Sequence, residues 1–244
     1  MNWHARYRQQ ARWTQSLRAY LFGKAAIAAN AQCLEVGCGT GALLEELSLR
    51  QETLLHGLDT NFLALREAAV HAPSAILLCA DGHALPYPNG LFDLTFCHYL
   101  LLWVRDPLRV ISEMRRVTRP GGVVLALAEP DYGGRIDYPP ELESLGILQS
   151  QALRTQGADP EIGRKLAGLF VQAGLRQVEA GILGAEWNTL TLHAESLEWS
   201  VLASDLAEYL SPQDLQTFQH QDTTARQNGQ RVLFVPTFFA WGRV

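Results

Sequence analysis

Long apolar runs are missing from this sequence of 244 residues, and none reaches the roughly 20 residues that cross a membrane. The first residues, Met1-Asn2-Trp3-His4, also lack the apolar segment of a secretory signal. No CxxC pair, HExxH motif or other cluster of cysteines and histidines has the spacing of metal ligands. We therefore expect a cytoplasmic protein with no membrane partner and no metal.

Acidic residues are missing from the first 34 residues, which hold five basic ones. The remainder therefore has fifteen basic and twenty-five acidic residues, a net charge of −10. An acidic body repels a polyanion, so we expect no nucleic-acid partner, although a small basic patch remains possible. The composition, 48% hydrophobic and 18% charged, fits one buried domain over residues 1–244. The sequence leaves the oligomeric state open.

Trp13, Leu17, Tyr20 and Leu21 recur at helical spacing within the acid-free segment. They predict one amphipathic helix from Tyr7 to Leu21. Three interpretations compete for it: a helix packed on its own domain, a removable presequence and a membrane-surface helix. We favour packing, because a discarded leader has no need of so many aromatic residues.

The cysteines Cys33, Cys38, Cys79 and Cys97 fall on or beside predicted strands and read as reduced core thiols. Cys33 precedes the most informative stretch, Leu34-Glu35-Val36-Gly37-Cys38-Gly39-Thr40-Gly41, and Cys38 lies within it. This stretch runs from an apolar strand into a leucine-bearing helix. Glycines in such a turn permit positive φ and let a ligand approach the backbone.

The spacing of Gly37, Gly39 and Ala42 also fits a dinucleotide fingerprint. Glu35 favours another ligand, because a carboxylate repels a pyrophosphate but suits a ligand with an ammonium and a sulfonium. S-adenosylmethionine is such a ligand. The segment resembles motif I of the class I S-adenosylmethionine-dependent methyltransferases, and the resemblance extends from about Ala31 to Ala128. The series Asp81-Gly82-His83-Ala84-Leu85-Pro86-Tyr87-Pro88, followed by Phe92-Asp93, also resembles that family.

The resemblance implies a cofactor site made by Glu35, Gly37, Gly39, Gly41, Asp59, Asp81, Gly82 and His98, with S-adenosylhomocysteine as product. Asp59, 18 residues after Gly41, would accept the ribose hydroxyls, or else Asp59 or Thr60 caps the next helix. Asp81 and Gly82 would hold adenine, or else form a plain turn.

His98 follows the fourth predicted strand, where the family places a residue beside the cofactor. With an unperturbed pKa near 6.5 it is a candidate catalytic base, although such a histidine is more often a pocket wall. Glu129 and Asp131 leave the fifth strand at the edge where open α/β folds bind substrates. They are candidate substrate ligands, with solvated loop acids as the alternative.

Strand and helix signals alternate along the chain, which predicts a doubly wound α/β fold. The strands are expected at 53–58, 76–80, 92–97, 123–128, 177–183 and 231–240, in addition to the strand before Gly37. By resemblance, this is a mostly parallel seven-stranded sheet whose final strand is antiparallel. We expect an N-terminal helical cap over residues 1–30 and insertions over 131–160 and 184–230, after strands five and six.

Such a chain is expected to transfer a methyl group from S-adenosylmethionine to a small-molecule nucleophile with an O, N or C acceptor atom. Three alternatives remain: a Rossmann oxidoreductase, a non-catalytic module that binds S-adenosylmethionine, and a methyltransferase acting on protein or RNA. The sequence does not identify the acceptor. The sulfonium already provides a good leaving group, so the enzyme does not need a strong base that would indicate which kind of acceptor it methylates.

Overall fold

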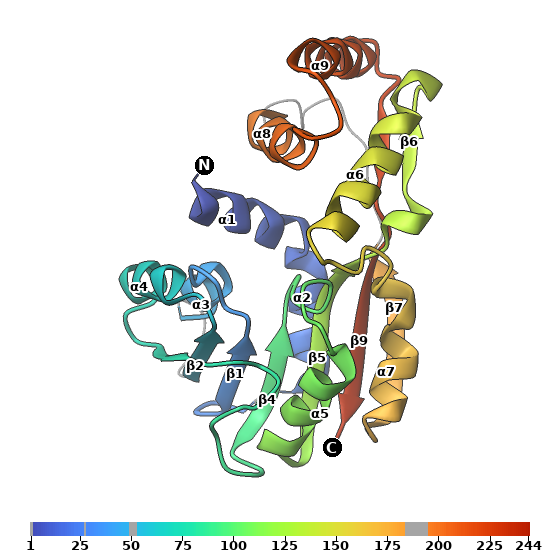
Figure 1. The fold of residues 1–244 in the computed structure, drawn as a ribbon. Helices are drawn as coiled ribbons and strands as arrows, with labels where there is room; N and C mark the ends of the chain where they lie inside the picture. The colour runs from blue at the N-terminus through green and yellow to red at the C-terminus, as the bar shows by residue number, and fades with distance from the viewer. Residues whose placement is uncertain (1, 27, 49–52, 184–194) are drawn as a thin grey trace.

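The computed structural model describes residues 2–26, 28–48, 53–183 and 195–244. Its centre is a seven-stranded sheet with the strand order β3-β2-β1-β4-β5-β9-β7 (Figure 1). The strands are β1 (Gln32–Val36), β2 (Leu54–Asp59), β3 (Ile76–Cys79), β4 (Phe92–Cys97), β5 (Thr118–Pro130), β7 (Arg176–Leu183) and β9 (Thr237–Arg243). The strands β1 to β5 run parallel, and β9 is antiparallel to both of its neighbours. The predicted fold class is confirmed.

Helices cover both faces of the sheet. On one face α5 (Pro107–Val117) and α7 (Leu166–Gln172) bury Val110, Met114 and Phe170 against it. On the other face lie α2 (Gln15–Ala25), α3 (Ala42–Ser48) and α4 (Phe62–His71). The start of α5 is as predicted, because the Asp106 carboxylate accepts the Arg109 N–H at 2.9 Å and Pro107 opens the first turn.

One predicted strand, Arg231 to Ala240, is two strands in the structure. Pro236 has no N–H to offer a ladder, and the chain breaks there into β8 (Val232–Phe234) and β9. The Pro236 carbonyl instead accepts the Asp131 N–H at 2.8 Å. β8 leaves the main sheet and pairs with β6 (Ile136–Tyr138) in a second, two-stranded sheet that the sequence did not predict.

A helical cap lies beyond the carboxyl ends of the parallel strands (Figure 1). It contains the two-stranded sheet and the helices α6 (Glu143–Thr155), α8 (Glu195–Asp205) and α9 (Pro212–Gln227), with the short helices η1 (Tyr132–Gly134) and η2 (Pro140–Leu142). A third short helix, η3 (Gly163–Lys165), leads into α7 beside the main sheet. Leu142, Leu145, Trp199 and Leu206 form its own small core. The predicted insertion over 184–230 begins with residues 184–194, which lie outside the described residues.

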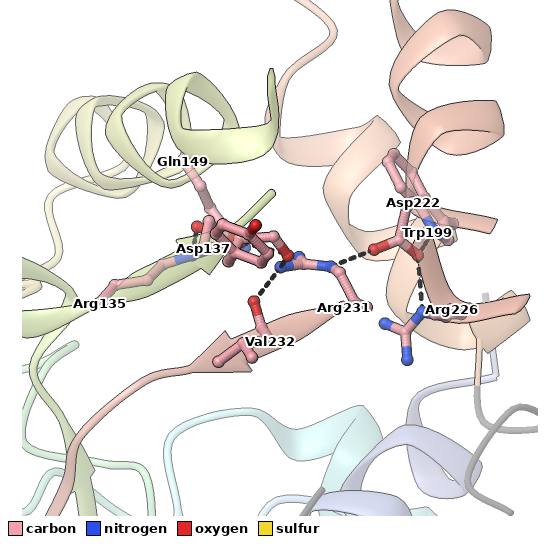
Figure 2. A network of polar contacts seen from close by, with 9 residues as sticks. Arg135, Asp137, Gln149, Trp199, Asp222, Arg226, Arg231 and Val232 are labelled. Atoms are coloured by element: carbon pink, nitrogen blue, oxygen red, sulfur yellow. Dashed lines mark hydrogen bonds and ion pairs between the residues drawn. The ribbon is translucent and has the colours of Figure 1, made fainter. Parts of the chain in front are cut away.

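A buried ion-pair network joins the parts of the cap (Figure 2). Arg231 lies between two carboxylates and binds Asp137 at 2.8 Å and Asp222 at 2.5 Å. Arg135 is a second partner of Asp137, and Arg226 is a second partner of Asp222. Because each carboxylate has two guanidinium partners, the cost of burying these charges is offset within the network.

The N-terminal segment differs from the predicted single helix. Thr14 separates α1 (Trp3–Trp13) from α2, and Trp13 and Tyr20 are 44% and 59% exposed. The predicted apolar stripe is therefore wrong at Trp13 and Tyr20, although Leu17 and Leu21 do pack against the core. The buried face also carries Ala11, Thr14 and Arg18. A charged residue can lie on that face because the Arg18 guanidinium donates to the Ala11 carbonyl, to Thr14 Oγ1 and to Glu46. Helix α1 extends toward α8 of the cap (Figure 1).

The cysteines are all unpaired, and three are buried as predicted. Cys79 is the exception, because β3 is an edge strand of the sheet and exposes this thiol. In the part of the chain that the structure describes, no helix combines the length and the apolar content needed to cross a bilayer.

Candidate functional site

The glycine turn between β1 and α3 adopts a backbone that other residues rarely form. Gly37, Gly39 and Gly41 have φ of +76°, +51° and +78°. A Cβ at Gly37 would lie 2.6 Å from a Leu100 methyl, and one at Gly39 would lie 3.0 Å from the Tyr7 ring. The N–H groups of Gly37 and Cys38 both donate to the Leu58 carbonyl, at 2.7 and 3.0 Å. The turn is thereby fixed against the end of β2.

Glu35, the acidic residue of the turn, is only 3% exposed, and its Oε2 has no hydrogen-bond partner among the described residues. Burial raises the pKa of Glu35 to about 8, although the positive charge of Arg18 opposes the shift. A buried carboxyl oxygen without a partner is costly, and a ligand that donates a hydrogen bond there removes that cost.

Asp59 ends β2 and uses both carboxylate oxygens to hold backbone. The Gly39 N–H donates to Oδ2 and the Asn61 N–H to Oδ1, each at 2.8 Å. Helix α4 is capped by Asn61, whose Oδ1 accepts from the Leu63 and Ala64 N–H groups. The alternative that Asp59 or Thr60 caps this helix is therefore wrong, and Asp59 belongs to the glycine turn.

Asp81 lies after β3, with its side chain 63% exposed. It accepts the His83 N–H at 2.9 Å, and its Oδ1 is 2.6 Å from His83 Nδ1. His83 Nε2 accepts the Asp106 N–H at 3.2 Å, which makes Nδ1 the protonated nitrogen. These hydrogen bonds, backbone first, hold the pKa of Asp81 below its usual value. A Cβ at Gly82 would lie 3.1 Å from Val36, so this turn packs against β1.

His98 follows β4, and its Nε2 lies 2.9 Å from Thr14 Oγ1 at the break between α1 and α2. Burial, followed by the charge of Arg18, lowers the pKa of His98 to about 3. The pKa of His98 thus lies well below the unperturbed value, and the imidazole stays neutral at physiological pH. Its suggested role as a base stays a prediction.

Glu129 does not have the solvent-exposed setting of the second sequence interpretation. The side chain is fully buried, so it is not a solvated loop acid. Its Oε1 accepts the Leu100 and Leu101 N–H groups at 3.0 and 2.9 Å, and its Oε2 accepts the Leu102 N–H at 3.2 Å. Glu129 therefore fixes the loop after β4. Burial nevertheless raises its pKa to about 7 against these hydrogen bonds.

Asp131 is likewise buried and paired, contrary to the solvated alternative. Arg164 of η3 donates to both of its carboxylate oxygens, at 2.6 and 2.7 Å. Such a bidentate contact fixes the orientation of the carboxylate and also compensates its charge. The two acids after β5 thus bind protein groups in this structure, and their suggested substrate contacts stay predictions.

Three residues of the N-terminal helices belong to the site, although sequence reasoning did not identify them. The Tyr7 ring lies against Gly39, and burial, followed by the charge of Asp59, raises its pKa. Thr14 contacts His98, and the charge of Arg18 acts on both Glu35 and His98. The only sequence signal was the absence of acids in this segment. The structure therefore groups Tyr7, Thr14 and Arg18 with the residues predicted around the glycine turn.

The comparisons with known proteins agree with this geometry. A family model described as "Methyltransferase domain" matches residues 34–126. The chain is 33% identical to an uncharacterized methyltransferase of Schizosaccharomyces pombe, over 57% of this chain and 55% of that protein. It is 31% identical to a demethylmenaquinone methyltransferase of Bacillus licheniformis, over 61% of this chain and 72% of that protein. The chain spans between 32% and 55% of the length of the first three curated relatives that it matches.

Among solved structures, the chain resembles a putative methyltransferase from an antibiotic biosynthesis pathway of Anabaena variabilis. The TM-score is 0.68 at 16% identity, over 94% of this chain and 97% of the other. That likeness shows the same fold. Together with the matching family model and the relative from Bacillus licheniformis, it identifies the protein: the chain belongs to the class I S-adenosylmethionine-dependent methyltransferases, a family of enzymes whose cofactor is S-adenosylmethionine.

Proposed function

We propose that this protein transfers the methyl group of S-adenosylmethionine to an O, N or C nucleophile of a small molecule. The observation that carries the proposal is the buried Glu35 carboxyl beside the glycine turn, with an oxygen that lacks a hydrogen-bond partner among the described residues. A cationic ligand with an ammonium group fits that oxygen, whereas a pyrophosphate does not.

The residues around the turn fit this cofactor. Glu35 would accept from its ammonium group, and the glycine backbone would hold its methionine part where a side chain would clash. Asp59 would accept from the ribose hydroxyls, because each carboxylate oxygen has a further lone pair beyond the backbone N–H that it holds. Asp81 and Gly82 would contact the adenine. When bound, the cofactor supplies a methyl group activated by a sulfonium.

The protein's contribution is to orient the acceptor and exclude water, which requires a covered space next to His98 and Tyr99. Helix α1 supplies one wall, because Arg6 Nη1 reaches Glu198 of α8 at 3.3 Å. The pKa of the half-buried Tyr132 is raised by desolvation, and Arg6 and Glu198 are among the charges that act on it. We propose that the acceptor binds among Arg6, Tyr99 and Tyr132, where aromatic rings and one cation are available.

Binding tests the cofactor assignment. In a calorimeter, S-adenosylmethionine and S-adenosylhomocysteine should both bind, whereas NAD should not. Glu35→Gln should weaken binding, while Glu179→Gln, which changes an exposed acid far from the turn, should not. Equal affinity in all three proteins would refute the role of Glu35.

A panel of acceptors tests the reaction. The relative from Bacillus licheniformis is a demethylmenaquinone methyltransferase, so reduced quinone head groups are the first compounds to try, followed by small carboxylates, phenols and amines. Mass spectrometry should find one compound heavier by a methyl group and an equal amount of S-adenosylhomocysteine. Cofactor binding without turnover on any acceptor, including a metabolite extract, would favour the non-catalytic alternative.

A further inference from the structure

Three potential metal ligands meet outside the predicted site, on helices that are far apart in the sequence. His4 belongs to α1, and Glu67 and His71 belong to α4, one helical turn apart. Each offers one donor atom, and these atoms all lie within 4.8 Å of one another. No local sequence pattern predicts this group, because 63 residues separate His4 from Glu67.

One nitrogen of His4, Nε2, has no well-aligned hydrogen bond among the described residues and faces Glu45 Oε2 at 3.4 Å. The residue is only 6% exposed, and its Nδ1 lies 2.9 Å from Thr40 Oγ1 in the glycine turn. If Nδ1 donates to that hydroxyl, the lone pair is on Nε2, which has no hydrogen-bond partner among the described residues. A histidine that binds a metal through one nitrogen commonly donates its other N–H to an oxygen in this way.

The surroundings of His4 combine a second imidazole with an acidic side chain. Its ring stacks on that of His71, with centroids 3.5 Å apart and planes 6° from parallel. Glu45 Oε2 is 3.4 Å from His4 Nε2 and 3.7 Å from Arg8 Nε. The free edge of the His4 ring thus lies in a partly acidic setting.

We propose that His4, Glu67 and His71 bind a divalent transition-metal ion of the zinc class, which joins α1 to α4 beside the glycine turn. Two imidazoles and one carboxylate favour such an ion over magnesium or calcium, which prefer oxygen ligands. Metal bonds of about 2.1 Å place two ligand atoms at most about 4.2 Å apart. For all three ligand atoms to reach one metal ion, the exposed Glu67 carboxylate must move closer and the His71 ring must rotate out of its stack on His4. The lone pairs of the three ligands then converge on the ion.

Metal titration tests this proposal directly. Untagged protein, stripped with a chelator, is titrated with zinc and with cobalt, whose visible absorption reports the ligands. One ion per chain should bind. His4→Gln and His71→Gln should each weaken binding by at least about 100-fold, since even the loss of an outer partner of a metal ligand costs about 10–100-fold. His220→Gln is the control, because this histidine is exposed on α9.

Glu67→Gln keeps the test decisive if the buried His4 variant fails to fold, because Glu67 lies on the surface. This variant should also bind zinc more weakly than the wild type. In the wild type, zinc should slow hydrogen exchange in α1, whereas in His71→Gln it should not. The proposal is overturned by a zinc dissociation constant larger than about 0.1 mM, or by unchanged zinc affinity in the Glu67 or His71 variant. It is also overturned if the cobalt-bound protein shows the near-ultraviolet band of a cobalt–thiolate bond, because a cysteine would then be the ligand.

Discussion

Thr14 Oγ1 and His98 Nε2 lie 2.9 Å apart, although 84 residues separate them in the sequence. The contact joins the break between the two N-terminal helices to the loop that follows β4. Arg18 donates to the same Thr14 oxygen, so the hydroxyl has a charged neighbour as well as the imidazole. The N-terminal segment is therefore connected by polar contacts to the place where the family holds its cofactor.

The depressed pKa of His98 predicts a pH-dependent contribution to stability. The native imidazole protonates only near pH 3, whereas an unfolded histidine protonates near 6.5. Between these values the unfolded state binds more protons, so the free energy of unfolding decreases as the pH falls, by up to about 1.4 kcal/mol per pH unit. Urea unfolding from pH 4 to 7 should show this slope in the wild type and a smaller one in His98→Gln. Identical slopes would contradict the prediction.

Glu35 should show the opposite sign. Its native pKa of about 8 lies above the unfolded value of 4.5, so the folded protein binds more protons between those pH values. Its contribution to stability is complete below pH 4.5 and is lost as the pH rises to 8. Binding of S-adenosylmethionine should release up to one proton near neutral pH, because an ammonium group favours the carboxylate. Calorimetry in buffers of different ionisation enthalpy should detect that proton, and Glu35→Gln should abolish it.

Asp59→Asn should weaken binding of S-adenosylhomocysteine by about 1–3 kcal/mol, the cost of leaving buried polar groups without a partner. Its loss also disturbs the Gly39 N–H contact, so affinity alone does not isolate the ribose. A 2′-deoxy analogue of the ligand separates the two effects. Loss of the 2′-hydroxyl should lower the affinity of the wild type for the ligand clearly, but should lower the affinity of the Asp59→Asn variant only slightly. An equal loss in both proteins would mean that Asp59 does not contact that hydroxyl.

Glu129→Gln should destabilise the fold, because an amide oxygen replaces only half of a carboxylate that accepts three N–H groups. The amide nitrogen would then face a backbone donor. We expect a loss of about 1–3 kcal/mol in the free energy of unfolding, measured by denaturant titration. Glu179→Gln removes an exposed partner of Lys24 and should change that free energy by less than about 1 kcal/mol. A neutral Glu129 variant would show that the loop after β4 does not depend on this side chain.

Asp222→Asn should loosen the cap and leave the main sheet intact. Burial favours the neutral form of Asp222, but hydrogen bonds from Arg226 and Arg231 outweigh it and lower its pKa. Removing the charge leaves Arg231 with only Asp137 as an acidic partner in the network (Figure 2), at a cost of about 3–5 kcal/mol. Hydrogen exchange should accelerate in α9 and β8 and remain slow in β1 and β4. Unchanged exchange in α9 would contradict this prediction.

Local signals in the sequence were sufficient for much of the main sheet. Phe92–Cys97 has the predicted bounds, and Asp106-Pro107 starts α5 as expected. The positive φ angles of Gly37, Gly39 and Gly41 also follow from the need for a tight turn. These features depend on neighbouring residues, which is why they could be read without a structure.

The failures concern contacts between distant parts of the chain. Apolar periodicity pointed to Trp13 and Tyr20, whereas the buried face of α1 and α2 includes Arg18, whose charge is tolerated only because of its partners. Glu129 was considered either a substrate ligand or a solvated loop acid, because it leaves a strand at the carboxyl edge of the sheet. Its burial depends on the three N–H groups of the loop after β4, and no local pattern reveals that pairing.

The position of β9 has a consequence for how this chain folds during its synthesis. It comes after all the other described strands in the sequence, yet it lies between β5 and β7 and pairs with both. Until residues 237–243 leave the ribosome, β7 has no neighbour and the edge of β5 offers unpaired backbone groups to other chains. The preceding strand, β8, completes the small sheet of the cap. Both sheets therefore close within the same short stretch of translation, and a nascent chain stalled before it would be a ready target for chaperones.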